Sequence, residues 1–169
     1  MDVFEALFTR RSIRSYTQEA VSEEDLECIL RAGMSAPSSH NNQPWHFVVV
    51  RDAAKRQFIS AHHPYAKMAA DAQIVIVVCA APEEMKESGF WQQDCSAAME
   101  NMLLAARGLN LGSVWCGMHP YEDRVEPIRS ILDIPEHIHL LGMAVIGHPA
   151  KPFTEVDRYK KEKIHRDRW

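Results

Sequence analysis

Three arginines and a serine fall within five residues near the start of the chain, in Arg10-Arg-Ser-Ile-Arg14. In an extended backbone successive side chains alternate between two sides, so Arg10, Ser12 and Arg14 would share one side. Guanidinium groups bind phosphate through paired hydrogen bonds, and a hydroxyl or backbone N–H groups can add to them. The segment predicts either a phosphate site or a solvated basic patch, and these five residues alone favour neither.

A polar loop, Ala36-Pro-Ser-Ser-His-Asn-Asn-Gln-Pro-Trp45, separates a helical pattern from an apolar strand pattern. Pro37 and Pro44 fix their own φ angles and restrict the preceding residue, so the loop is stiff and unlike a flexible linker. Its neutral hydroxyl and amide groups both donate and accept hydrogen bonds. Such groups suit a heteroaromatic ring or a polyol better than a bare phosphate. They belong to Ser38, Ser39, Asn41 and Gln43.

Gly112-Ser-Val-Trp-Cys-Gly117 has the pattern of a strand that enters a loop. Gly117 would allow a ligand to approach the backbone closely. Trp115 and Cys116 could lie against such a ligand, but one aromatic ring and one thiol are also common in protein cores. Both interpretations remain open from the sequence.

The histidines carry a weaker signal. His62-His63, and His137 with His139, could ligate a metal, but adjacent histidines diverge and no third ligand follows at a suitable spacing. His40 and His119 could border a pocket or simply be solvated. The chain has no Gly-x-Gly-x-x-Gly motif, so we expect no Rossmann dinucleotide domain and only transient binding of any nicotinamide nucleotide.

Apolar periodicity and capping residues predict the elements that position these stretches. Ser22 is the expected N-cap of one helix, and Gly108 the expected C′ residue of a long, mostly apolar one. The run from Gln73 to Ala80 is typical of a strand buried on both faces, which requires helices on both sides. We expect helices over 2–9, 22–36, 52–70 with a break at Pro64, 90–107 and 122–132, and strands over 45–50, 73–80, 112–117 and 138–146.

Length and composition fit a single domain, 1–169, with its own core, because 46% of the residues are apolar and 25% are charged. A net charge of −4 argues against a nucleic-acid partner. No apolar run or leader pattern predicts a membrane segment, and four separately placed cysteines indicate reduced thiols, so we expect a cytoplasmic protein. Residues 151–169 carry seven Lys and Arg against four Asp and Glu and have no apolar core, so this tail must bind something or stay solvated.

Taken together, these motifs resemble the FMN-dependent nitroreductase family. The resemblance rests on Arg-Arg-Ser-Ile-Arg-x-Tyr, Ala-Pro-Ser-Ser-x-Asn-x-Gln-Pro-Trp, Gln93-Asp-Cys95, the 112–117 stretch, Ile146-Gly-His-Pro149 and Asp157-Arg-Tyr159, and it spans nearly the whole chain. It implies an α+β, three-layer α-β-α sandwich of the nitroreductase-like type that forms an intertwined homodimer. Residues 150–169 would then be a C-terminal tail that wraps the partner subunit.

The resemblance also implies where FMN binds. Its phosphate would meet Arg10, Ser12, Arg14 and Arg158, with Arg11 contributing mainly backbone. The loop residues Pro37, Ser38, Ser39 and Asn41 would come from the other subunit, with Gln43 as a support or a ring contact. Trp115, Cys116 and Gly117 would lie against the isoalloxazine ring, with a backbone N–H of Cys116 or Gly117 near the hydride-accepting nitrogen.

The activity implied is transfer of hydride from NADH or NADPH through FMN to a nitroaromatic, a quinone or a similar small electron-poor acceptor, with no side chain as nucleophile and no metal. Two alternatives stay open. One is a specialised flavin reaction such as reductive dehalogenation, against which the short 80–90 segment speaks because related enzymes add lid elements there. The other is a non-catalytic flavin-binding or sensing protein.

Overall fold

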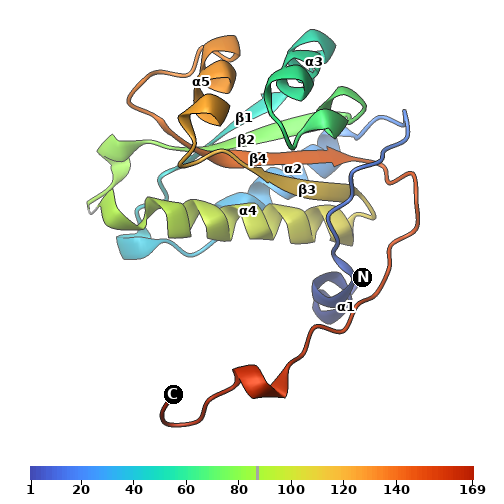
Figure 1. Ribbon diagram of the computed structural model, residues 1–169, viewed down its shortest axis with the longest axis vertical. Helices are drawn as coiled ribbons and strands as arrows, with labels where there is room; N and C mark the ends of the chain where they lie inside the picture. Colours follow the sequence, from blue (N-terminus) through green and yellow to red (C-terminus); the bar gives the residue numbers. More distant parts are fainter. Residues whose placement is uncertain (87) are drawn as a thin grey trace.

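A four-stranded antiparallel sheet forms the middle layer of the molecule, with strand order β1-β2-β4-β3. The computed structural model describes every residue except Glu87. Helices α3 and α5 cover one face of the sheet, and α2 and α4 cover the other, with α1 beyond α4 (Figure 1). This arrangement confirms the predicted α+β, three-layer sandwich.

The predicted elements are present, with ends that differ by one or two residues from the expected bounds. The strands are β1 (Trp45–Val50), β2 (Ile74–Ala80), β3 (Gly112–Gly117) and β4 (His139–Gly147). The α-helices are α1 (Val3–Thr9), α2 (Glu23–Met34), α3 (Ala53–His62), α4 (Trp91–Gly108) and α5 (Glu122–Ile131). Short 3₁₀ turns lie at Ser39–Asn41, Lys67–Ala70, Pro82–Glu84, Ser88–Phe90 and Lys161–Lys163.

The core lies on both faces of the sheet because β2 and β4 are its two central strands. Every residue of β2 is buried, as its continuous apolar run predicts. Ile74, Ile76 and Val78 pack towards α2 and α4, whereas Val75 and Val77 pack towards α3 and α5. The mostly apolar helix α4 is buried between the sheet and α2 of the same chain.

Side-chain caps fix where three helices begin. The side chains of Asp2, Ser22 and Asp52 accept hydrogen bonds from backbone N–H groups in the first turns of α1, α2 and α3. These bonds satisfy N–H groups that have no partner within the helix. The predicted cap at Ser22 is confirmed by the 3.0 Å bond from the N–H of Asp25 to its Oγ.

The end of α4 corrects one prediction. Gly108 is still helical, and the residue with left-handed backbone is Asn110, with φ 60°. The N–H of Leu111 donates to the Ala106 carbonyl (2.8 Å), and the N–H of Asn110 donates to the Arg107 carbonyl (3.0 Å), which is the Schellman pattern. The Arg107 guanidinium also donates to Asn110 Oδ1, so a side-chain contact selects Asn110 over the more usual glycine.

Residues 10–17 run along the outer edge of β3. The N–H of Ile13 donates to the Ser113 carbonyl (2.9 Å), and the Ile13 side chain fills the space over Gly112 that a Cβ would occupy. Tyr16 is buried, and its hydroxyl donates to the carbonyls of Ile13 and Val145. The basic segment is therefore anchored to the sheet edge by its apolar neighbours.

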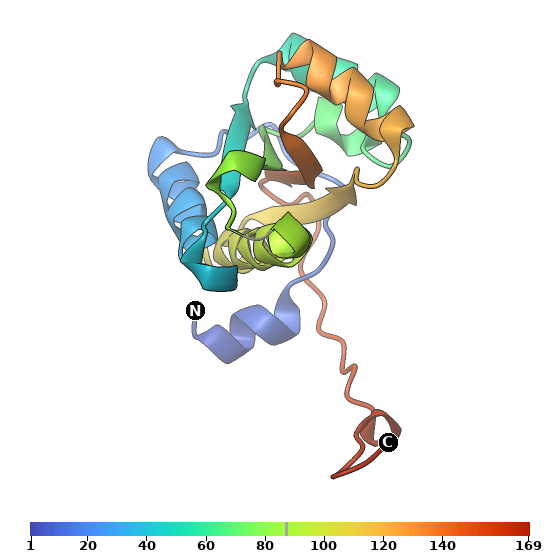
Figure 2. The ribbon, with the colours of Figure 1, turned by 90° about the vertical axis from the view of Figure 1, so that its left-hand side faces the viewer.

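The tail after β4 leaves the body of the molecule and runs past α1 (Figures 1 and 2). Almost every residue from 151 to 169 is exposed. Phe153 is the main anchor, because the guanidinium of Arg107 lies 3.9 Å above its ring. None of the helices that the structure describes is long and apolar enough to cross a membrane.

Candidate functional site

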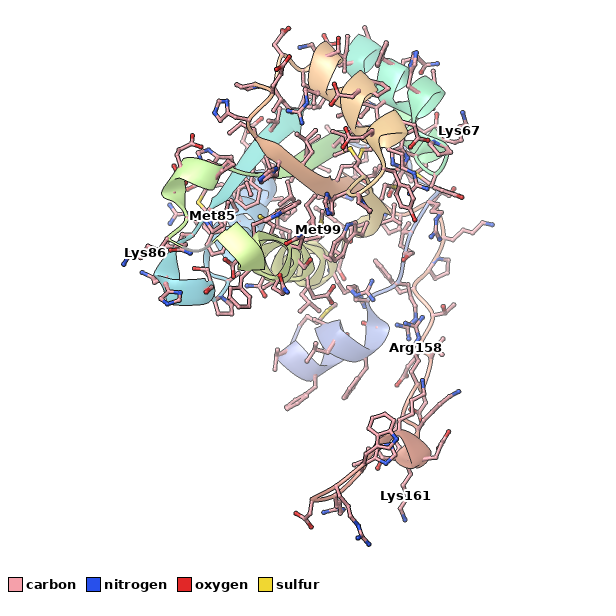
Figure 3. The ribbon with its side chains drawn as sticks, turned by 60° about the vertical axis from the view of Figure 1, so that its left-hand side comes forward. Lys67, Met85, Lys86, Met99, Arg158 and Lys161 are labelled. Atoms are coloured by element: carbon pink, nitrogen blue, oxygen red, sulfur yellow. The ribbon has the colours of Figure 1, made fainter. Side chains whose placement is uncertain are left out.

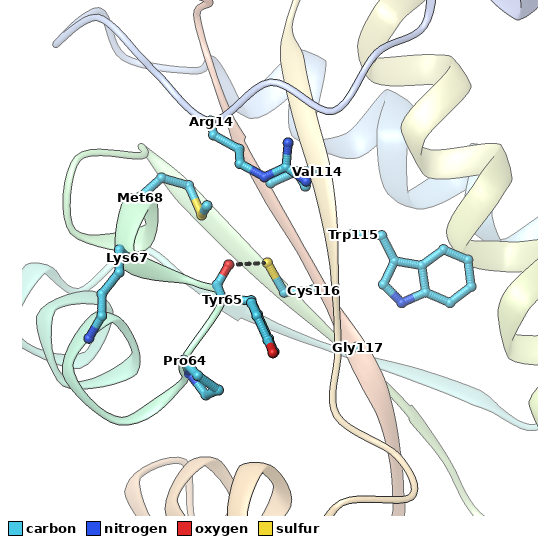
Figure 4. Close-up of a pocket in the computed structure, with 9 residues that line it drawn as sticks. All are labelled: Arg14, Pro64, Tyr65, Lys67, Met68, Val114, Trp115, Cys116 and Gly117. Atoms are coloured by element: carbon cyan, nitrogen blue, oxygen red, sulfur yellow. Dashed lines mark hydrogen bonds between the residues drawn. The ribbon is translucent and has the colours of Figure 1, made fainter.

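A cavity of about 450 Å³ lies between the edge of β3 and the turn that follows α3. Its volume falls within the usual range for small-molecule sites. Figure 4 shows its two walls, with residues 64–68 on one side and 114–117 on the other, and Arg14 at one end. The lining therefore includes four predicted site residues, Arg14, Trp115, Cys116 and Gly117.

The wall formed by residues 64–68 was missed by the sequence reasoning. It contributes Pro64, Tyr65, Lys67 and Met68, so that Lys67 adds a second cation to that of Arg14. The sequence contains a signal for this wall, since the helical pattern breaks at Pro64 and an aromatic residue and a lysine follow. Nothing in that pattern indicates that the turn faces β3, because this contact is set by the packing of α3 on the sheet.

The two side chains at the end of β3 point in opposite directions. The indole of Trp115 turns away from the Tyr65 wall (Figure 4) and packs against the core on the α4 side. The thiol of Cys116 faces the Tyr65 wall and donates to the Tyr65 carbonyl (3.4 Å). Burial raises the pKa of this thiol to about 11, so it is protonated at neutral pH. Core packing thus accounts for the indole, and Cys116 lines the cavity as a neutral thiol.

The main chain of β3 presents polar groups to the cavity side. The Ser113 carbonyl points away from β4, towards Ile13, and backbone groups alternate along a strand. The N–H groups of Trp115 and Gly117 therefore share the open edge with the Ser113 carbonyl. Cys116 is aligned with Met143 in the ladder to β4, so its N–H points towards β4 and away from the open edge. Of the two N–H groups predicted for a ligand, that of Gly117 is the accessible one.

A second cavity, of about 620 Å³, lies between α1 and the start of the tail. Its charged lining is Arg10, Arg11, Arg158, Glu155 and Asp157, so two of the cations predicted for a phosphate, Arg10 and Arg158, lie together beside Arg11, which was expected to contribute mainly backbone. Arg10 pairs with Glu100 (3.3 Å) but remains partly exposed. Arg11 donates to the carbonyls of Phe8 and Val156, which joins the tail to α1.

The two cavities lie along one extended segment. Arg10 lines the second cavity and Arg14 the first, and four extended residues span about 13 Å. Ser12 lies between them, exposed, where its backbone bridges to Ser113. Such an arrangement suits a ligand with an anionic group at one end and a planar ring at the other.

The polar loop holds an unusual backbone. His40, Asn41 and Gln43 all have positive φ, at 52°, 55° and 51°. Left-handed conformations of residues other than glycine are uncommon and concentrate at functional sites. The loop is braced internally, because Ser38 Oγ accepts from the N–H of Gln43 (3.0 Å) and Asn41 Oδ1 accepts from the Gln43 amide (3.0 Å).

Within one chain this loop lies far from the arginines. The N–H of Ser39 donates to Asp94 in the first turn of α4 (2.8 Å), whereas Thr9 accepts from Arg107 in the last turn (2.9 Å). Thirteen helical residues separate these anchors, a rise of about 20 Å. In Figure 3, Lys86, whose N–H donates to Asn42 in the loop, lies on the opposite side of the body from Arg158. The structure therefore gathers the predicted residues into two half-sites, the second containing Pro37, Ser38, Ser39, Asn41 and Gln43.

Metal binding gains no support from the described residues, which contain no group of three or more His, Cys, Asp or Glu side chains able to hold an ion. His63 is instead fully buried against Tyr65 and Gly117. Burial lowers its pKa, so the ring is neutral.

Known proteins resemble this chain in both sequence and structure. The model of the "Nitroreductase family" matches residues 7–148. A protein of Methanothermobacter thermautotrophicus named "Putative NADH dehydrogenase/NAD(P)H nitroreductase" is 46% identical over 169 residues, which cover all of this chain and 88% of the relative.

Two solved structures show the same architecture. A structure from Bacteroides thetaiotaomicron, also described as "Putative NADH dehydrogenase/NAD(P)H nitroreductase", superimposes with a TM-score of 0.94 at 41% identity, covering 99% of this chain and 98% of that one. A "putative nitroreductase in complex with FMN" from Desulfovibrio desulfuricans superimposes with a TM-score of 0.88 at 35% identity, covering 100% and 98%.

Proposed function

The chain belongs to the nitroreductase family, and on this premise we propose that it is a homodimeric oxidoreductase that uses FMN to pass hydride from NADH or NADPH to electron-poor acceptors such as nitroaromatics or quinones. The observation that carries the proposal is the pair of cavities joined by residues 10–14. One cavity offers Arg14, Lys67 and the open N–H of Gly117 to a ring, and the other offers Arg10 and Arg158 to a phosphate. FMN has a ring and a phosphate joined by a polyol, so the residues present fit it.

Two surfaces support the homodimer. The loop of residues 37–43 lies about 20 Å of helix away from Arg10 in its own chain, so a complete site requires the loop of a second chain. Phe4 and Phe8 of α1 are 64% and 59% exposed, and large apolar surfaces of this kind usually mark an interface. In the proposed dimer each chain forms one domain, 1–169, and its C-terminal tail, residues 150–169, wraps the partner.

The bound FMN would supply the redox chemistry, and the protein residues bind, orient and shield it. Arg10 and Arg158 would hold the phosphate through charge-assisted hydrogen bonds. Tyr65 and Met68 form the apolar wall that excludes water from the ring, and no side chain acts as a nucleophile. All four cysteines are free thiols, which agrees with the cytoplasmic location that we propose.

The decisive experiment follows the flavin absorbance of the purified protein without oxygen. NADH or NADPH should bleach the visible absorbance, and a nitroaromatic or quinone should restore it. A protein that binds FMN but is not bleached by either nucleotide would favour a sensing role. A protein that binds no FMN would refute the proposal.

The arginines provide a direct test of the assignment of FMN to the two cavities. Arg10→Ala combined with Arg14→Ala should yield colourless protein, because the cofactor loses cations at both cavities. Each lost charge-assisted bond is worth about tenfold in affinity or more. Arg31→Ala removes an exposed arginine on α2, away from both cavities, and should leave the FMN content unchanged. Stoichiometric FMN in the Arg10/Arg14 variant would contradict the assignment.

A further inference from the structure

His63 joins the two walls of the first cavity. Its side chain is fully buried, with Nε2 3.1 Å from the Gly117 carbonyl oxygen and Nδ1 3.2 Å from the N–H nitrogen of Tyr65. An N–H must donate to Nδ1, and a carbonyl can only accept, so the neutral ring carries its proton on Nε2. One imidazole therefore bonds simultaneously to the turn after α3 and to the last residue of β3.

The Gly117 carbonyl receives a second donor from the other side. Arg124 of α5 places Nη1 3.4 Å from this oxygen, while its guanidinium lies 4.0 Å above the Tyr121 ring and 5.1 Å from that of Tyr65. Gly117 is thus held by α5 as well as by His63. The peptide planes beside Gly117 are also tied to β4, since Cys116 is paired with Met143 and the N–H of Met118 donates to the Leu141 carbonyl (3.2 Å), so what His63 adds is a link between this backbone and the Tyr65 turn. A Cβ on Gly117 would meet nothing within 4 Å.

We propose that His63 is a positioning residue for the flavin: it fixes the Gly117 backbone, and with it the open N–H, at a set distance from the Tyr65 wall. This inference rests on the proposed function. A precisely oriented donor requires support from the residues behind it, and a small displacement of such a donor weakens its contact with the ligand.

The choice of residue supports this role over core filling. A buried polar ring is tolerated only when its hydrogen bonds are satisfied, whereas an apolar side chain would fill the same space without that requirement. Both hydrogen bonds of His63 are made to the cavity walls, one with the Tyr65 N–H and one with the Gly117 carbonyl. Arg124 does not duplicate this link, because its bond to Gly117 is longer (3.4 Å) and its contact with Tyr65 is to the ring and not to the backbone.

The test compares two amide substitutions that differ in reach. The amide nitrogen of His63→Gln can lie near the former Nε2 position and still donate to Gly117. The side chain of His63→Asn is too short to reach Gly117 and can serve only Tyr65, whose N–H its amide oxygen can accept. The neighbouring His62 is exposed and stacks on Phe58 within α3, so His62→Asn is a matched control outside the cavity. Three quantities are measured: the FMN dissociation constant, the midpoint potential of the bound flavin, and amide hydrogen exchange around Tyr65 and residues 117–118 in FMN-free protein.

We expect His63→Asn to bind FMN about tenfold more weakly, since one hydrogen bond is lost, and to shift the midpoint potential and speed the exchange. His63→Gln should recover most of all three, and His62→Asn should match the wild type. If His63→Asn does not fold, His63→Phe takes its place in the comparison. Unchanged affinity, potential and exchange in the variant that lacks the Gly117 bond would overturn the positioning role. A wild type that binds no FMN would instead refute the proposed function, while the exchange measurement would still report on the bridge.

Discussion

Gly117 is a position where an added methyl group should weaken ligand binding without affecting folding. Its φ is not positive, and a Cβ there would meet no other atom of the chain within 4 Å. The fold therefore does not require glycine at this position, which agrees with the close approach of a ligand that we propose here.

We predict that Gly117→Ala leaves the melting temperature almost unchanged and weakens FMN binding at least about tenfold, because the methyl group holds the ring away from the backbone. Gly112→Ala is the matched control. Its Cβ would lie 2.7 Å from Cγ2 of Ile13, so it should destabilise the protein. Thermal denaturation and a fluorescence titration with FMN measure the two effects, and wild-type affinity in Gly117→Ala would show that no ligand approaches there.

His63 also makes a prediction about pH. Burial is the main cause of its lowered pKa, and the Arg124 charge lowers it further, while the bond to Gly117 and the Asp123 charge act in the opposite direction. The unfolded chain therefore binds more protons than the folded one once the pH falls through the ordinary histidine pKa near 6.5, and stability is lost on the acid side. His63→Gln should be less sensitive, so its free energy of unfolding should fall less between about pH 7.5 and about pH 5.5 in urea titrations. Equal losses in both proteins would contradict this reasoning.

For individual residues, the sequence indicates where charged groups cluster but does not indicate which distant residues contact one another. Clustering in the sequence drew attention to Arg10 and Arg14, and the family resemblance drew attention to Arg158, and each of the three lines a cavity. Lys67 and His63 could not be predicted. Lys67 looks like an ordinary surface lysine in the sequence, and His63 stands beside His62 in a pair of which one member is buried and the other exposed. Only the packing of α3 on the sheet brings either to the cavity.

At the scale of the elements, the end of α4 determines how the chain enters β3. Asn110 adopts φ 60°, its N–H and that of Leu111 close the helix, and its side chain accepts from Arg107. Non-glycine residues other than Asn and Asp rarely adopt this conformation, because Cβ crowds the carbonyl.

Asn110→Ala should therefore destabilise the protein by about 1–2 kcal/mol, the usual cost of a left-handed conformation. Asn110→Gly removes the same side-chain contact without the steric penalty and should be clearly more stable than the alanine variant. Urea denaturation of the three proteins checks the order. Equal stability of the two variants would mean that the hydrogen bond to Arg107, and not the backbone, is the important feature.

The elements themselves could be predicted because their apolar patterns are strong, as in the fully buried β2. The error at Gly108 arose because glycine is the usual residue after a helix, whereas here the helix continues through it and a local contact favours Asn110. The three positive φ angles in the 37–43 loop are only partly foreshadowed in the sequence, since His40 and Asn41 are of types that adopt such angles more often than most residues, whereas Gln43 is not.

At the scale of the whole molecule, α4 separates the arginines near Thr9 from the 37–43 loop, and in the proposed dimer these two groups would serve different FMN molecules. We predict that a chain lacking the arginines and a chain lacking the loop donors rescue each other. Arg10→Ala with Arg14→Ala, and Ser38→Ala with Asn41→Ala, should each bind little FMN alone. Refolded together at equal amounts they should recover about a quarter of the wild-type FMN, because half the dimers are mixed and each has one complete site.

The readout is FMN absorbance per chain after the mixture is passed through a desalting column. Mixing either variant with itself is the control for the refolding step. No recovery in the mixture, with both variants folded and dimeric by sedimentation, would mean that each site is built from one chain. The sequence could suggest this division of labour only through the family it resembles, because distances between half-sites depend on the length and direction of α4.

The separation of the arginines from the loop by α4 has a consequence for mutant alleles of the gene. In the proposed dimer each chain contributes its arginines to one FMN site and its loop to the other. A chain that is defective in both regions therefore inactivates both sites of any dimer that it forms with an intact chain. A cell that makes equal amounts of healthy and doubly damaged product would retain only the healthy–healthy pairs, about a quarter of its capacity and not half. Such an allele would behave as dominant negative, whereas a deletion of the same gene copy would not.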